Sequence, residues 1–372
     1  MLLATGEVSE IAASFRERDA AAPESYPAEN IASLYDARMV PGPFPASLGG
    51  RGWTLRESVD AICTIASQSP STALIVSMPL GLAGACFATD RGFAPPGWRD
   101  RWREQIEWAA SEYRAHRLFA ACNSEKGAGG SLAAINTVAT VSGGGFQLNG
   151  EKILASGGRN ASWFFSTTKV DPADLPGAGV VEFFLMPAAG KGVDVRDDWD
   201  GFGMRSTESQ SVHYQDAPAH ALLGFPNFIN TVRPLQYWFC LFAAIPLGCV
   251  RGIIDALTTP APSSPALRLR IADAVMRYEA IDAYLQTTAE AWTPGADAAY
   301  AGRVLRAKTY VTMEAAKLSA ELFSLSGGRH YRRNDYVAGL LADTFAGTAL
   351  RPPLALALES IVEQFEDVVL RA

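Results

Sequence analysis

Hydrophobic periodicity changes twice along this chain, and this change limits the folds that it can adopt. Apolar residues recur at three- and four-residue spacing in 28–40 and 54–68, a pattern typical of amphipathic helices. In the middle of the chain they fall instead in short β-branched and aromatic runs, and helical spacing then returns. The order predicts a multidomain α+β protein with an N-terminal α-helical domain (1–115), a middle antiparallel β-domain (116–222) and a C-terminal four-helix bundle (223–372).

The middle segment contains four stretches that predict strands. They are "RLFAAC", "GGFQLNGEKILAS", "SWFFSTTKV" and "VVEFFLMP", and Gly, Pro and Asp residues bound them. Asn149 and Gly150 divide the second stretch. This dipeptide favours a two-residue hairpin turn, because both turn positions need positive φ. A hairpin is therefore expected at 149–150.

Charge and composition exclude several classes of function. The 372 residues carry a net charge of −7 and no block of Lys and Arg, which disfavours nucleic acid as a partner. The N-terminus does not resemble a signal peptide, and the apolar run 237–250 contains a proline and is shorter than the roughly 20 residues of a membrane span. The five cysteines form no CxxC pair and the four histidines lack metal spacing. A cytoplasmic protein with reduced thiols, no metal and no membrane contact is expected.

Two C-terminal stretches present an apolar face at helical spacing. The first face consists of Val304, Val311, Ala315, Leu318 and Leu322, and the second of Leu354, Leu358, Ile361, Phe365 and Val368. The proline-rich segment 258–266 interrupts the helical pattern between them and the apolar run 237–250. These faces predict long helices that bury apolar surface within the chain or between subunits.

Five short motifs have an order and spacing that resemble those of the acyl-CoA dehydrogenase superfamily. They are "FPASLGG" (44–50), "CNSEKGAGGS" (122–131), "LNGEKILASGGRNASWFF" (148–165), "WDGFGMRSTESQSV" (199–212) and "FSLSGGRHY" (323–331). The fourth is similar to a strand pair of that family. The resemblance covers nearly the whole chain and implies a flavin oxidoreductase, in a superfamily that includes two-component flavin monooxygenases.

The second and third motifs hold the predicted cofactor site. Glycines without Cβ atoms let backbone N–H groups approach a flat or phosphorylated ligand, although such a loop can also be plain flexible surface. By resemblance, the Ser156 hydroxyl faces the reactive flavin N5 and Leu154 covers the ring. FAD is expected, and FMN is the less favoured cofactor. The predicted cofactor-binding residues are Cys122, Ser124, Gly127, Gly129, Gly130, Leu154, Ala155, Ser156, Ser324, Gly327 and Gly328.

The last motif bears on assembly. By resemblance, Gly327 and Gly328 receive the adenosine half of FAD from a neighbouring subunit, which implies a dimer or homotetramer; the other interpretation is a helix C-cap. The family also sends an arginine toward the partner's FAD, and here only Arg268 or Arg270 could substitute for it. Other implied partners are a small-molecule substrate, possibly acyl-CoA, and a flavin reductase or electron-transfer flavoprotein.

The catalytic base of the family is missing from both of its usual positions. Counting from Asp343, which matches a family aspartate, the position of the base is Arg351, and a guanidinium cannot accept a proton. The alternative position is Trp238, and an arginine that many members place beside it is Phe239. The catalytic residue is therefore unknown from the sequence.

Three interpretations remain open. The favoured one is an oxygenase-type flavin enzyme that needs no such base, in which Arg351 faces an anionic group unless it only points into solvent or caps a helix. The second is an acyl-CoA dehydrogenase with a displaced base, for which Glu208 and Asp335 are distant candidates. The third is a catalytically silent binding protein. Arg205, Thr207 and Ser209 also permit a catalytic role, although a role in folding the β-domain is favoured.

Overall fold

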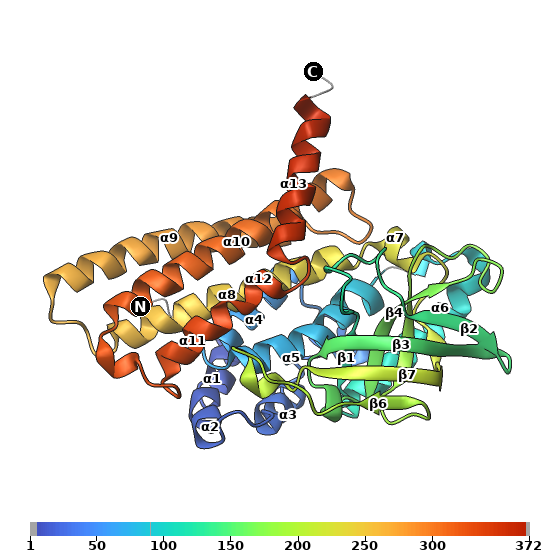
Figure 1. Cartoon of the computed structure of the whole chain (residues 1–372), viewed down its shortest axis with the longest axis horizontal. Coiled ribbons are helices and arrows are strands. Elements are labelled where there is room, and N and C mark those ends of the chain that lie inside the picture. The colour runs from blue at the N-terminus through green and yellow to red at the C-terminus, as the bar shows by residue number, and fades with distance from the viewer. Residues whose placement is uncertain (1–5, 90, 370–372) are drawn as a thin grey trace.

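The computed structural model describes residues 6–89 and 91–369, and it has helices at both ends of the chain with a sheet between them (Figure 1). The N-terminal α-helices are α1 (Glu7–Ala12), α2 (Phe15–Ala21), α3 (Ala28–Asp36), α4 (Leu55–Ala66), α5 (Pro70–Gly81) and α6 (Arg99–Arg114). Thr54 and Glu57 form a capping box that fixes the start of α4. Helix α5 is buried on all sides and continues into a buried π-helical turn, Leu82–Phe87.

The eight strands form one sheet of mixed direction. They are β1 (Phe119–Cys122), β2 (Val138–Ser142), β3 (Gly145–Ala155), β4 (Trp163–Val170), β5 (Glu182–Pro187), β6 (Val193–Val195), β7 (Gln210–Pro218) and β8 (Ala221–Leu222). Their order is β6-β7-β3-β2-β4-β5-β8, with β1 also paired to β4. Because β1 and β2 both run parallel to β4, the prediction of a purely antiparallel domain is wrong for this part of the sheet.

The hairpin turn lies before the position that the sequence predicted. Strand β3 continues through Asn149 and Gly150, and the turn that joins β2 to β3 is Gly143-Gly144, with φ of 59° and 82°. The prediction of a hairpin at 149–150 is therefore wrong. Gly150 has a φ of 152° at a register shift, and a Cβ there would lie 2.4 Å from the Thr137 Oγ1 atom. The glycine permits a bulge and a close strand contact instead of a turn.

The fourth motif is mostly a loop. Strand β7 begins only at Gln210, so the expectation that 199–212 forms a strand pair is wrong for its first part. Residues 205–207 form a 3-10 turn between Met204 and Glu208, which both have left-handed backbone angles. The Thr207 hydroxyl donates to the Met204 carbonyl and stabilises this turn.

The C-terminal part of the chain is helical, and its central element is the apolar helix α8. They are α7 (Phe228–Val232), α8 (Leu235–Thr258), α9 (Pro265–Glu290), α10 (Ala298–Leu325), α11 (Tyr336–Thr344), α12 (Ala346–Ala349) and α13 (Leu354–Val369). Helix α8 packs against α9, α10 and α11 and also against α4 and α5, so the N-terminal helices complete the predicted bundle. Two segments, Pro70–Phe87 and α8, are long and apolar enough to cross a membrane, but they are 100% and 83% buried inside the protein.

Helix α13 projects away from the other C-terminal helices (Figure 1). Its side chains Leu358, Val362 and Phe365 are exposed, whereas the predicted face residue Val368 lies outside the described side chains. By contrast, Val304, Val311, Ala315, Leu318 and Leu322 of α10 are all buried, as their spacing predicts. The apolar face of α13 is therefore not covered within a single chain.

Candidate functional site

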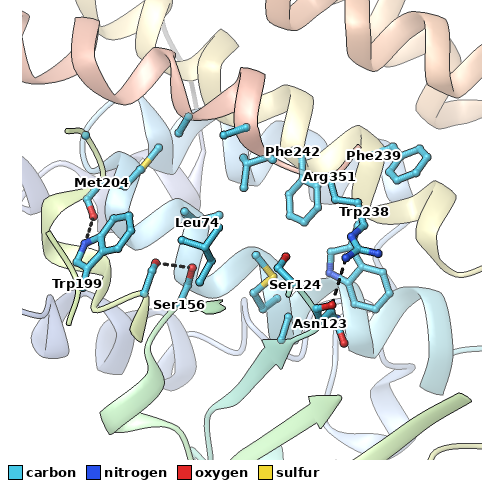
Figure 2. A pocket seen from close by; sticks show the side chains of 18 of the residues that line it. Leu74, Asn123, Ser124, Ser156, Trp199, Met204, Trp238, Phe239, Phe242 and Arg351 are labelled. Atoms are coloured by element: carbon cyan, nitrogen blue, oxygen red, sulfur yellow. Dashed lines mark hydrogen bonds between the residues drawn. The ribbon is translucent and has the colours of Figure 1, made fainter. Parts of the chain in front are cut away.

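A largely apolar pocket of about 310 Å³ lies where the sheet meets helices α5, α8, α11 and α12. This volume is at the lower end of the range for small-molecule sites. The aromatic side chains in its wall include Phe165, Phe183, Trp199, Trp238, Phe239 and Phe242. Among the described residues that line the pocket, Arg351 is the one ionisable side chain. Figure 2 shows Ser156, Trp199 and Met204 on one side of the view and Arg351, Asn123 and Trp238 on the other.

Three of the predicted flavin-contacting residues line this pocket. Ser124 follows β1, and Leu154 and Ser156 lie at the end of β3, where the register shifts between Lys152 and Ala155. Leu154 has a φ of 60° and a half-exposed side chain. A left-handed backbone is unfavourable for a leucine, so the bulge that aims its side chain at the pocket carries strain of about 1–3 kcal/mol. Such strain is typical of residues that contact ligands.

The Ser156 hydroxyl has a defined hydrogen-bond direction. Thr207 donates its proton to the Met204 carbonyl at 2.8 Å, so it can only accept from Ser209, 2.7 Å away. Ser209 therefore uses its proton on Thr207 and accepts from Ser156, 2.9 Å away. Since the Ser156 proton is committed to this chain, Ser156 can offer a group in the pocket only an acceptor lone pair. The group that meets Ser156 must then be a hydrogen-bond donor.

Asp343 holds the loop of this hydroxyl chain in place. Its Oδ1 atom accepts from the Met204 N–H at 2.5 Å, and a Cβ on Gly203 would lie 2.7 Å from the Ala342 carbonyl, so this loop and α11 pack closely. Burial raises the pKa of Asp343 to about 6, although the Met204 N–H and the Arg205 charge oppose the increase. Asp343, which the resemblance matched to an aspartate of the family, thus acts here as a buried anchor of the pocket wall.

The Asp343→Asn variant is expected to be more stable than the native protein at pH 8, by about 1–3 kcal/mol, and to have no advantage near pH 4. The folded pKa lies above the ordinary value, so the native carboxyl keeps its proton between about pH 4 and 6 while the unfolded one loses it. The contribution of Asp343 to stability therefore decreases as the pH rises through this window. Asparagine keeps an acceptor for Met204 without the buried charge. Urea unfolding at several pH values measures the difference, with Asp100→Asn, an exposed carboxylate, as control.

Arg351 lies at the opposite end of the pocket with unused hydrogen-bond capacity. Its Nη2 atom donates to the Asn123 carbonyl at 3.2 Å, while the buried Nη1 atom has no hydrogen-bond partner among the described residues. Burial lowers the pKa of Arg351 to about 10, and the carboxylate of Glu125 opposes this decrease. The guanidinium remains charged at neutral pH. The alternative that Arg351 only points into solvent is therefore wrong.

Lys308 of α10 fixes the loop that carries Arg351. Its ammonium donates to the carbonyls of Gly347, Leu350 and Pro352 at 3.0, 2.7 and 2.7 Å. Burial lowers the pKa of Lys308 to about 7, while the three carbonyls favour its charged form. All three protons are used within the protein, so Lys308 acts on the pocket only through the loop.

A buried ion pair supports the loop that contains Ser124. Lys152 Nζ lies 2.6 Å from the Glu125 carboxylate, which also accepts from Asn136 and twice from Thr137. Burial alone would raise the pKa of Glu125, but the bonds from Lys152 and Thr137 outweigh this and lower it. Burial lowers the pKa of Lys152. Neither member lines the pocket.

The other predicted cofactor residues lie outside the pocket lining. The Cys122 and Ala155 side chains are buried in the core of the β-domain, and burial raises the pKa of the Cys122 thiol to about 11. All five cysteines are free and buried. A Cβ at Gly127 or Gly129 would meet no atom within 4 Å, so this loop surface is open to a ligand, whereas a Cβ at Gly130 would lie 2.4 Å from Pro353.

The 324–328 turn is not brought to the pocket within one chain. Ser324 bonds to the Ala320 carbonyl within α10, and Cβ atoms at Gly327 and Gly328 would meet open space. Arg268 and Arg270 are exposed on α9. A contact with a neighbouring subunit's cofactor stays a prediction.

Neither the alternative base position, Trp238, nor the candidate displaced bases supply a base to the pocket. Trp238 lines it, but its Nε1 donates to the Ser77 carbonyl at 3.2 Å and its ring stacks on Phe165. Glu208 pairs with Arg159 at the surface, and Asp335 caps α11 and contacts His330. Neither carboxylate lines the pocket, so the hypothesis that one of them is a displaced base is wrong for this site.

The sequence analysis missed several residues of the site. Asn123 supplies the carbonyl to Arg351, and Lys308 holds its loop. Lys308 lies four residues after Val304 and three before Val311, so a lysine on an otherwise apolar helix face was the available signal. No sequence pattern predicts the hydrogen-bonded chain of the Thr207, Ser209 and Ser156 hydroxyls, because the first two lie about 50 residues from Ser156 along the chain.

Comparison with known families identifies the middle of the chain. The model of "Acyl-CoA dehydrogenase, middle domain" matches residues 120–217, the segment that contains Ser124, Leu154 and Ser156. Residues 120–217 therefore form an acyl-CoA dehydrogenase middle domain by sequence. No cluster of three or more His, Cys, Asp or Glu side chains that could hold a metal ion occurs in the part of the chain that the structure describes.

Curated relatives show similarity in sequence, and solved structures show similarity in fold. The dibenzothiophene monooxygenase of Rhodococcus erythropolis is 28% identical over 225 residues, which are 50% of this chain and 53% of that protein. FMN-bound TdsC from Paenibacillus sp. A11-2 has a TM-score of 0.80 at 20% identity, over 97% of this chain and 96% of that chain. Butyryl-CoA dehydrogenase from Megasphaera elsdenii has 0.79 at 17% identity, over 98% and 100%. The two structures share the acyl-CoA dehydrogenase fold with this chain. The chain spans about half the length of the curated relative.

Proposed function

We propose that this protein is a flavin-dependent oxidoreductase of the oxygenase type, with the flavin ring in the pocket against Leu154 and Ser156. Bound flavin would supply two-electron redox chemistry and, when reduced, reactivity toward O₂. The residues present fit such a group: the wall is apolar, the neighbouring Gly127 and Gly129 surface is open, and Ser156 offers one oriented polar contact. The similarity to a monooxygenase and to an FMN-bound structure supports the proposal.

The observation that carries the oxygenase assignment is the charge of the pocket. A dehydrogenase that removes a proton next to a thioester carbonyl needs a positioned base, which contributes about 10²–10⁴ in rate. The described pocket lining contains no carboxylate and no histidine, and its one ionisable group, Arg351, cannot accept a proton. Transfer of oxygen to a substrate does not require that base.

The direction of the hydroxyl chain supports a reduced flavin as the bound form. Ser156 presents an acceptor lone pair, because its proton is committed to Ser209. A reduced flavin ring carries an N–H where the oxidised ring has an acceptor nitrogen. Two facing acceptors would cost about 1–3 kcal/mol of lost hydrogen bonding. This polarity favours an enzyme that takes up flavin already reduced by a separate flavin reductase.

Self-association belongs to the same proposal. The exposed apolar side chains of α13 and the open Gly327-Gly328 turn are surfaces that a second copy could cover, and a dimer or tetramer remains our expectation.

The decisive experiment supplies the purified chain with FAD or FMN and compares two reactions. We expect flavin binding at micromolar concentration, no bleaching of the flavin by short-, medium- or long-chain acyl-CoA thioesters, and substrate-dependent O₂ consumption when NADH and a flavin reductase are added. Aromatic acids and phenols are the substrates to try first. Bleaching by any thioester at ordinary dehydrogenase rates would establish an acyl-CoA dehydrogenase instead. Absence of flavin binding would leave only the silent binding protein.

A further inference from the structure

The end of the pocket around Arg351 has the features of an anion site. Arg351 Nη1 is buried and has no partner among the described residues, although a guanidinium left without acceptors in an apolar wall is costly. Trp238, stacked on Phe165 with ring centroids 5.5 Å apart, and Phe239 form the adjoining wall. Figure 2 shows Arg351 beside Trp238 and Phe239. An aromatic wall with one free cation fits a flat ring that carries one negative charge.

The other buried cations near this pocket are already satisfied. Lys308 gives its three protons to backbone carbonyls, and Lys152 pairs with Glu125 at 2.6 Å. No salt bridge joins Arg351 to any acid within the described chain. Glu125, whose carboxylate raises the pKa of Arg351, is paired with Lys152. Arg351 is therefore the group with capacity left for a ligand.

We propose that Arg351 is the specificity residue of this pocket and binds the anionic oxygen, carboxylate or phenolate, of an aromatic substrate. This deepens the proposed function by naming its substrate class. The guanidinium donates to the anionic oxygen, while its Nη2 atom stays on the Asn123 carbonyl. The ring of the substrate packs on the wall formed by Trp238 and Phe239. The charged end of the substrate then lies at Arg351, and its other end points toward Ser156.

The test uses binding in the purified chain without added flavin, so that it does not depend on catalysis. Benzoate is titrated against its neutral counterpart benzamide by calorimetry. We expect benzoate to bind about 10–100-fold more tightly, because charge-assisted hydrogen bonds are worth about 1.5–3 kcal/mol. Arg351→Gln should abolish this preference, and Arg351→Lys should keep part of it. Arg333→Gln, which removes an arginine with an 81% exposed side chain, should leave it unchanged.

A second probe needs no variant. Bound 4-nitrophenol changes colour when it ionises, and we expect the native protein to lower its apparent pKa and Arg351→Gln not to do so. Equal affinity for benzoate and benzamide, or 4-nitrophenol bound in its neutral form, would overturn the proposal. So would an Arg351→Gln variant that loses flavin affinity but keeps the benzoate preference, because Arg351 would then hold the cofactor. Benzoate binding without flavin binding would support Arg351 as an anion site while contradicting the proposed redox function.

Discussion

Replacing Lys152 by methionine is expected to lower the free energy of unfolding by about 3–5 kcal/mol. The Lys152 side chain is fully buried and its ammonium lies 2.6 Å from the Glu125 carboxylate. Methionine fills a similar volume but leaves that carboxylate charged in the protein interior, where Asn136 and Thr137 are its remaining donors among the described residues. Urea unfolding monitored by tryptophan fluorescence at pH 7 measures the change.

The double variant Lys152→Met with Glu125→Gln distinguishes charge from packing. Glutamine keeps an acceptor for Thr137 without a charge, so the double variant should recover most of the stability that Lys152→Met loses. Arg277→Met is the matched control, because it breaks the exposed Arg277–Glu321 pair and should cost at most about 1 kcal/mol. If Lys152→Met and Arg277→Met have equal effects, the buried pair does not stabilise the loop of Ser124 in the way that its geometry indicates.

Hydrophobic patterning predicted the order of helices and strands because burial imposes a period on each element. The apolar face of α10 and the four strand stretches all lie where the pattern placed them. The same reasoning failed at Asn149-Gly150, because the glycine there is required by a close contact with Thr137, just before strand β2, which no local pattern reveals. It also missed the parallel pairing of β1 and β2 with β4, which depends on long crossovers.

For the site, the sequence indicated residue types but not their use. The position of Arg351 followed from counting along the chain, yet its free Nη1 atom depends on how the 347–352 loop approaches the Asn123 carbonyl. Likewise, Ser156 was named by resemblance, whereas its acceptor role follows from a chain of three hydrogen bonds through Ser209 and Thr207 to the Met204 carbonyl. Such directions arise only from three-dimensional contacts between distant segments.

Replacing Lys308 by methionine is expected to lower the free energy of unfolding by about 3–5 kcal/mol and the benzoate preference more than tenfold. The side chain is 1% exposed and supplies the hydrogen bonds of the Gly347, Leu350 and Pro352 carbonyls. Methionine removes a buried charge, which is favourable and offsets part of the lost stability. The three carbonyls, however, then lack their donor. The loop can satisfy them only by turning toward water, which would move Arg351 away from Asn123.

The two readouts separate an effect on the loop from an effect on the whole protein. Lys317→Met is the control on the same helix, because Lys317 is exposed and pairs with Glu314 at the surface, so neither readout should change. Lys308→Arg keeps the charge but has a planar head with a different reach, and it should preserve stability better than methionine does. If Lys308→Met destabilises the protein while the ionisation of bound 4-nitrophenol stays as in the native chain, Lys308 only stabilises the fold. If both change together and Lys308→Arg restores part of each, the lysine positions Arg351 through the backbone that joins them.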